Sequence, residues 1–67
     1  MSVAKVSEIS ATSKTSFEDA IQQGLARAKK TIRNIRSLWI KEQQARVADG
    51  KITDYQVNML VTFELDD

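Results

Sequence analysis

The sequence predicts an α+β fold in which one helix packs against a three-stranded antiparallel sheet, in the order β-α-β-β. Three observations lead to this prediction. The middle of the chain carries apolar residues at spacings of three and four, which is typical of an amphipathic helix. Residues 52–65 alternate between apolar and polar side chains, which is typical of a strand with one buried face. Asp49-Gly50, just before that segment, marks a two-residue hairpin turn.

Residues 3–11 are rich in small and β-branched side chains and predict a first short strand, followed by a polar turn. Ser16 then suits the N-cap of the helix, and Asp19 stands at its third position. Gly24 interrupts the helical propensity, which indicates a close contact with another backbone at that point. We expect the helix to end near Asn34. Its apolar stripe consists of Phe17, Ala20, Ile21, Leu25, Ala28, Ile32 and Ile35.

The hairpin turn also predicts the register of residues 38–47 against the last strand. A two-residue turn places Val47 opposite Ile52, Gln43 opposite Gln56, and Trp39 opposite Leu60. These pairs share the sheet face that the helix does not cover, whereas the opposite face lies under the helix and carries Leu38, Ile40, Met59, Val61 and Phe63. One additional loop residue would move the second strand to the other face.

The size and composition of the chain point to self-association. With 67 residues it forms a single domain, 1–67, whose own core is marginal. It has no cysteine and no histidine, which removes disulfides and the usual zinc sites as stabilising devices. The uncovered face carries an apolar set, Trp39, Ala45, Val47, Ile52 and Leu60. We interpret this set as a subunit interface rather than as a scatter of exposed apolar residues.

Several function classes have little support. Ten Lys and Arg against nine Asp and Glu give a net charge of +1, which indicates neither a nucleic-acid nor a membrane partner. No apolar run is long enough to cross a bilayer, and residues 1–12 do not resemble a signal peptide, so we expect a cytoplasmic protein. Without histidine, cysteine or a glycine-rich phosphate loop, we expect no enzyme.

Trp39 and Gln56 form the most suggestive pair of side chains. An indole offers a flat apolar plane for stacking, and a side-chain amide offers both a donor and an acceptor, so together they suit a planar heteroaromatic ligand. From the residues alone, the alternative in which Trp39 fills a subunit contact has more support. Hard cations need several oxygen ligands. Acidic residues that could supply them at a symmetry axis are Glu42, Asp49, Glu64, Asp66 and Asp67.

Over nearly its full length the sequence resembles the dodecins, a family of small flavin-binding proteins. The resemblance rests on the order and spacing of short stretches rather than on one motif. They are Val3-Ala-Lys-Val6, Ala20-Ile21, Leu25-Ala-Arg-Ala28, Asp49-Gly-Lys-Ile52, Tyr55-Gln-Val57 and Val61-Thr-Phe63. The resemblance implies a β-α-β-β subunit whose sheet wraps the helix and a hollow homododecamer. It also implies flavins bound as stacked pairs between tryptophans of neighbouring subunits.

The resemblance further implies that the protein stores or sequesters FMN or riboflavin without turnover. Gln56 matches the family glutamine that contacts the flavin edge. The family tryptophan corresponds to Ser37, two residues before Trp39, and a family arginine that serves the flavin phosphate corresponds to Gln44. The expected flavin site thus comprises Trp39, Gln56, Arg46, Gln44 and Lys41, with Arg46 or Lys41 near the phosphate. The alternative is a flavin-independent cage with a structural or calcium-binding role, as in one branch of the family.

Overall fold

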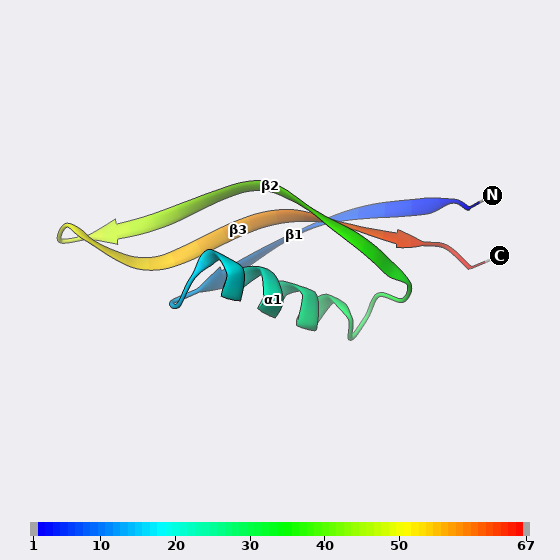
Figure 1. Ribbon diagram of the computed structural model, residues 1–67, viewed down its shortest axis with the longest axis horizontal. Coiled ribbons are helices and arrows are strands. Elements are labelled where there is room, and N and C mark those ends of the chain that lie inside the picture. The colour runs from blue at the N-terminus through cyan, green and yellow to red at the C-terminus, as the bar shows by residue number, and fades with distance from the viewer. Residues whose placement is uncertain (1, 67) are drawn as a thin grey trace.

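The computed structural model describes residues 2–66 and has the element order predicted from the sequence. Its elements are β1 (Ala4–Ser13), α1 (Phe17–Ala28), β2 (Ile35–Ala48) and β3 (Lys51–Glu64). The strands form one antiparallel sheet in the order β1-β3-β2, so β3 is central and α1 lies across one face (Figure 1). The predicted α+β class, with one helix on a three-stranded antiparallel sheet, is confirmed.

The first strand is longer than predicted, because it continues past the expected range 3–11 to Ser13, which pairs with Tyr55. Ser13 is buried and joins the end of β1 to the first turn of α1. Its hydroxyl donates to Asp19 Oδ2 at 2.6 Å and accepts from the backbone N–H of Thr15 at 2.9 Å. These bonds give the turn a buried polar anchor.

The helix begins as predicted and ends earlier than predicted. Ser16 is the N-cap, and its hydroxyl accepts from the backbone N–H of Asp19 at 2.9 Å. The last helical residue is Ala28, so the expected continuation of the apolar stripe through Ile32 and Ile35 is wrong.

Asn34 forms the turn that leads into β2. Its backbone has φ of 61°, a left-handed conformation that asparagine adopts more readily than most residues. Its side-chain amide donates to Asp66 Oδ1 at 2.9 Å, and the backbone N–H of Glu64 donates to the Asn34 carbonyl at 3.1 Å. The turn is therefore held by the end of β3, and Ile35 opens β2 opposite Phe63.

The hairpin between β2 and β3 turns at Asp49-Gly50, as predicted. The two residues have φ of 52° and 73°, the positive values that a two-residue type I′ turn requires. Ala48 pairs with Lys51, which confirms the two-residue loop.

A bulge changes the predicted register further along the hairpin. Thr53 has no partner on β2, so each following residue of β3 pairs with a β2 residue one position nearer to the turn than predicted. Gln44, not Gln43, therefore lies opposite Gln56. For the same reason Gln43 and Ala45 lie on the helix side of the sheet, and their predicted placement on the uncovered face is wrong.

A second bulge restores the predicted register. Lys41 is the additional residue on β2, and it offsets the additional residue on β3. Trp39 consequently lies opposite Leu60, as predicted. Ile40 lies opposite Met59 on the helix side, also as predicted, although it remains 44% exposed.

The core lies between α1 and β3. Ala20, Val57 and Met59 form a cluster that is wholly buried. Gly24 allows the close approach of helix and sheet, because a Cβ atom there would overlap Met59 Cε and lie 3.2 Å from Ala11 Cβ. The predicted close contact at Gly24 is present, but it is made with the side chains of Met59 and Ala11 and not with another backbone, as was expected.

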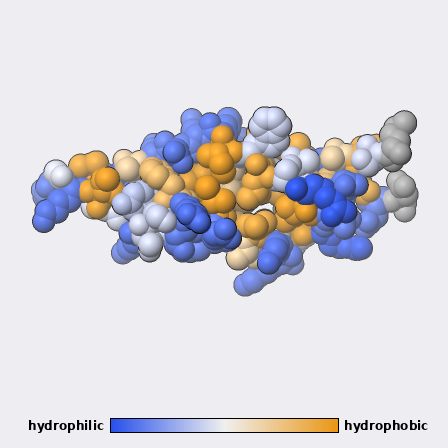
Figure 2. Space-filling model, viewed as in Figure 1, coloured by the Kyte–Doolittle hydropathy of each residue, from blue (hydrophilic) through white to orange (hydrophobic). Residues whose placement is uncertain are grey.

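The chain is extended, and the β2–β3 hairpin projects well beyond the helix (Figure 1). Its extents are 52 × 19 × 13 Å, and its radius of gyration is 13.9 Å, against about 11 Å for a compact chain of this length. Its accessible surface of 5027 Å² exceeds the roughly 4,200 Å² typical of a folded monomer of this mass. Figure 2 shows apolar surface along most of the long axis, including the projecting hairpin. A single copy therefore leaves much apolar surface in water.

Candidate functional site

The sheet face away from α1, which we call the open face, carries the polar side chains of interest. On β3 the residues Val57 and Met59 point toward the helix, so Gln56 and Asn58 point away from it. Directly paired residues of an antiparallel sheet share a face, which places their partners there too. The open face includes Glu8, Ser10, Trp39, Glu42, Gln44, Arg46, Asp54, Gln56, Asn58 and Leu60.

Trp39 presents the aromatic surface of the open face. It stands on the edge strand β2 opposite Leu60 and is 65% exposed in the single chain. A large indole left this accessible beside an aliphatic side chain marks a surface suited to a partner or a planar ligand.

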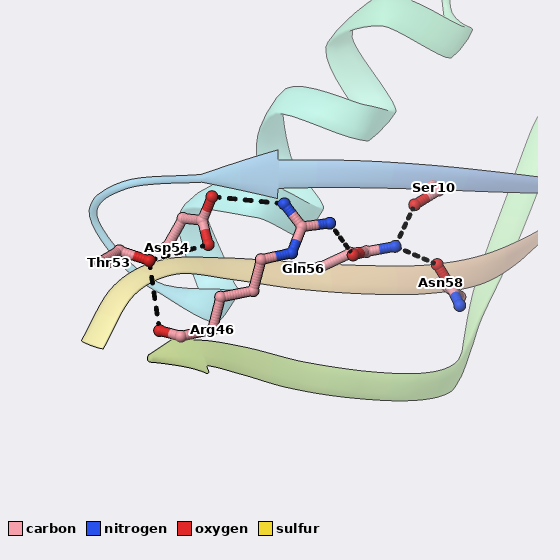
Figure 3. A network of polar contacts seen from close by, with 6 residues as sticks. All are labelled: Ser10, Arg46, Thr53, Asp54, Gln56 and Asn58. Carbon is pink, nitrogen blue, oxygen red and sulfur yellow. Dashed lines mark hydrogen bonds and ion pairs between the residues drawn. The ribbon is translucent and has the colours of Figure 1, made fainter. Parts of the chain in front are cut away.

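Gln56 is the centre of a polar network on the central strand (Figure 3). Its carbonyl oxygen Oε1 accepts a hydrogen bond from Arg46 Nη2. Its amide nitrogen Nε2 donates to Ser10 Oγ at 3.0 Å and to Asn58 Oδ1 at 3.3 Å. The side chain thus joins all three strands, since Ser10 lies on β1 and Arg46 on β2.

Arg46 is held both through its guanidinium and through its backbone carbonyl. Its Nη1 lies 3.4 Å from Asp54 Oδ2, the carboxylate directly across the sheet. Its backbone carbonyl accepts from the hydroxyl of Thr53, the bulge residue, at 3.3 Å (Figure 3). The bulge therefore helps to hold the strand segment from which the guanidinium reaches Gln56.

The network continues from Gln56 to a second charged group. Asn58 Nδ2 donates to Glu42 Oε1 at 2.9 Å. Gln44 stands opposite Gln56 and, with its neighbour Gln43, borders a shallow hollow that Glu42 and Asn58 complete. This end of the open face offers amides and charged groups within a small area.

Lys41 lies on β2 between Trp39 and the network, and it forms an ion pair of its own. Its Nζ is 3.3 Å from both carboxylate oxygens of Glu8. Because Glu8 belongs to β1 and Lys41 to β2, the ion pair reaches across the central strand beside Leu60, the partner of Glu8. Both side chains are about half exposed, so the pair is screened by solvent.

The structure places the five predicted site residues in two groups. Gln56, Arg46 and Gln44 lie together at the hairpin end of the open face, and Trp39 and Lys41 lie toward its middle. Leu60, opposite Trp39, and Gln56, opposite Gln44, are four positions apart on β3, which corresponds to about 13 Å along the strand. A ligand that touches both groups must therefore be elongated or be held by more than one subunit.

The sequence reasoning missed several members of the network, among them Ser10, Asn58 and Glu42. Asn58 was expected on the correct face but without a role. Ser10 joins Gln56 only because β1 pairs with β3, and the strand order was not predicted. Glu42 reaches Asn58 because the bulge places them opposite each other. The pairing pattern, rather than any local motif, is the signal that identifies them.

Among the acidic residues considered as cation ligands, those that the structure describes do not converge within one chain. Glu64 pairs with Arg36 at 2.7 Å, and Asp66 pairs with Arg33 at 3.3 Å. Asp67 lies outside the described residues. Within residues 2–66, no three acidic side chains gather closely enough to hold a metal ion. The same range contains no helix that is both long and apolar enough to span a membrane.

The comparisons with known proteins agree on one family. The family model described as Dodecin matches residues 3–66. The chain is 37% identical over 65 residues to a dodecin from Thermus thermophilus, covering 97% of this chain and 94% of the relative. A solved dodecin from Streptomyces davaonensis superposes with a TM-score of 0.92 at 33% identity, covering 98% and 97% of the two chains.

A calcium dodecin from Mycobacterium tuberculosis is also similar, at 39% identity over 66 residues, with 97% of this chain and 92% of the relative covered. Its crystal structure, described as having a novel calcium-binding site, superposes with a TM-score of 0.81 over 96% of this chain and 91% of that chain. The backbone of this chain is thus closer to the Streptomyces protein than to the calcium-binding one.

Proposed function

The chain belongs to the dodecin family, and from this premise we propose that it is a non-catalytic flavin-binding protein that stores or sequesters FMN or riboflavin in a homododecamer. The observation that carries the proposal is the exposed indole of Trp39 on the same face as the polar network at Gln56. A stacking plane and an oriented amide suit the two different parts of a flavin, its apolar ring face and its polar pyrimidine edge.

The open face supports assembly as well as binding. One Trp39 can cover only one face of a ring, and the other face would remain in water in a single chain. A second copy packed against the open face would cover it and would bury part of the exposed apolar surface. The extended shape of the chain supports the same interpretation, because its surface exceeds that of a compact monomer.

The residues have distinct proposed roles. Trp39 stacks on the isoalloxazine ring, and Gln56 bonds the edge of its pyrimidine ring. Lys41 serves the phosphate of FMN, because the Glu8 carboxylate that pairs with it is half exposed and screened by solvent, whereas the Asp54 carboxylate that pairs with Arg46 is only 21% exposed. Gln44 borders the site beside Gln56. No bond is made or broken in this function. The bound flavin supplies only its light absorption and redox chemistry, and stacking on an indole would quench its excited state.

The experiment that tests the proposal compares Trp39→Ala with Trp39→Phe in equilibrium titrations with FMN. Loss of aromatic stacking should weaken binding by about 1–3 kcal/mol, or roughly 5- to 150-fold, in Trp39→Ala. Trp39→Phe keeps an aromatic plane and should lose less. Light scattering verifies that both variants assemble as the wild type does. Unchanged affinity in an assembled Trp39→Ala protein would refute the stacking role.

The alternative function is a flavin-independent cage that binds cations, and similarity to the calcium dodecin favours it. Any such site would draw carboxylates from several subunits, since the described acidic residues of one chain stay apart. Calorimetric titration with Ca²⁺ separates the two proposals. Tight saturable Ca²⁺ binding by a protein that does not bind flavin would favour the cation cage.

A further inference from the structure

In the polar network on the open face, the charged groups at the two ends determine which atom of each hydrogen bond donates and which accepts. A guanidinium can only donate hydrogen bonds, and a carboxylate can only accept them. Arg46 stands at one end and Glu42 at the other, with the amides of Gln56 and Asn58 between them. A neutral amide between two neutral groups could flip by half a turn, but these two amides cannot do so without losing a bond to a charged group.

The fixed direction determines what Gln56 has left to offer. Its Oε1 faces Arg46, so its Nε2 faces Ser10 and Asn58, and both N–H groups are used there. One lone pair of Oε1 remains. Gln56 therefore presents an acceptor, and no free donor, to a molecule on the open face.

Arg46 completes the pattern beside that acceptor. Its five N–H groups include one directed to Gln56 and one directed to Asp54. Of those that remain, one can donate to a ligand carbonyl. The pair offers an acceptor next to a donor, which matches a ring edge where an imide N–H adjoins a carbonyl. Asp54 at 3.4 Å offsets the positive charge and makes Arg46 less suited to a phosphate.

We propose that Arg46 is a positioning residue that locks the Gln56 amide with its carbonyl outward, so that the site selects flavins with a free imide N–H. This inference rests on the proposed flavin function and adds to it a residue and a selectivity. It also replaces the expected phosphate role of Arg46, leaving that role to Lys41.

The test measures the ratio of the affinities for two flavins rather than one affinity alone. Wild-type protein is titrated with riboflavin and with 3-methylriboflavin, whose imide nitrogen carries no hydrogen. The wild type should prefer riboflavin by roughly 3- to 10-fold, the effect of one hydrogen bond between neutral groups. Arg46→Gln removes the charged donor that faces Gln56 Oε1 and leaves only the neutral bond to Asn58 to orient the amide, so the preference should fall. Arg46→Lys keeps a group that only donates and should retain most of the preference.

A second comparison separates the positioning role from a phosphate role. Arg46→Gln should weaken riboflavin and FMN by the same factor, whereas Lys41→Met should weaken FMN alone. An Arg46→Gln protein that keeps the preference for riboflavin, or that loses affinity only for FMN, overturns the inference and leaves the flavin function standing. A wild-type protein that binds no flavin overturns both. Light scattering of each variant verifies assembly, and Arg46→Lys provides the readout if Arg46→Gln does not assemble.

Discussion

Replacing Gly24 with alanine tests how tightly α1 is packed against the sheet that carries the site. The added Cβ would overlap Met59 Cε and lie 3.2 Å from Ala11 Cβ and 3.7 Å from Ile9 Cδ1. Two effects compete. Alanine is favoured over glycine in a helix by about 1 kcal/mol, and overpacking a core costs about 1–3 kcal/mol.

The contacts decide which effect wins. The Met59 methyl group can move, but it is wholly buried and has little room, and Ala11 Cβ is fixed to the backbone of β1. We therefore expect Gly24→Ala to lower the free energy of unfolding by about 1 kcal/mol net. That loss corresponds to a melting temperature roughly 4–8 °C lower. The assay is thermal unfolding at a fixed protein concentration, because assembly contributes to stability.

Two further variants separate the cost of overpacking at Gly24 from the gain in helix propensity. Ala26→Gly, at an exposed position of the same helix, should cost about 1 kcal/mol through helix propensity alone. Met59→Leu removes the Cε atom, so Gly24→Ala should be less harmful in that background, with a coupling of about 0.5–3 kcal/mol. If Gly24→Ala stabilises the protein by the full propensity gain and shows no coupling to Met59, the proposed close packing is wrong.

Three other substitutions probe the turn, the buried anchor and the assembly. Gly50→Ala should lower the free energy of unfolding, measured with urea, by about 1–2 kcal/mol, because Gly50 has φ of +73° and the space around it is open, so that backbone strain is the only cost. Asp49→Asn should leave the stability unchanged, and equal effects of the two substitutions would contradict a type I′ turn. Ser13→Ala should lower the free energy of unfolding by about 1–3 kcal/mol in the same assay, since the Asp19 carboxylate and the Thr15 N–H each lose a hydrogen-bond partner. An unchanged stability would mean that water replaces the hydroxyl. Ile52 is an exposed apolar residue of the hairpin, so Ile52→Lys should reduce the mass of the assembly measured by light scattering, whereas Thr53→Lys should leave it unchanged. An unchanged mass in Ile52→Lys would exclude the hairpin from the subunit interface.

The sequence was sufficient for the elements whose signals are local. The alternation of β3 follows from period-two burial, and the Asp49-Gly50 turn follows from the positive φ values that these residues tolerate. The helix N-terminus was correct because Ser16 caps it by a local bond. Its C-terminus was misplaced because Ile32 and Ile35 keep helical spacing by coincidence. Ile35 belongs to β2.

The site could be predicted only in part, because its geometry depends on pairing between distant segments. The bulges at Thr53 and Lys41 have no local signature and exist only relative to the partner strand. Since their shifts cancel, Trp39 was placed correctly while Gln43 was not. The bond between Arg46 and Gln56 likewise depends on the shifted register, which places Arg46 opposite Asp54 rather than opposite Thr53.

The most direct test of the flavin proposal is a titration of FMN and riboflavin with purified protein, following flavin fluorescence, on a sample whose mass is known from light scattering. Twelve copies of the 7.5 kDa chain give a particle of about 90 kDa. The proposal predicts strong quenching that saturates in proportion to the number of subunits at that mass. A particle of that mass that leaves flavin fluorescence unchanged would contradict it.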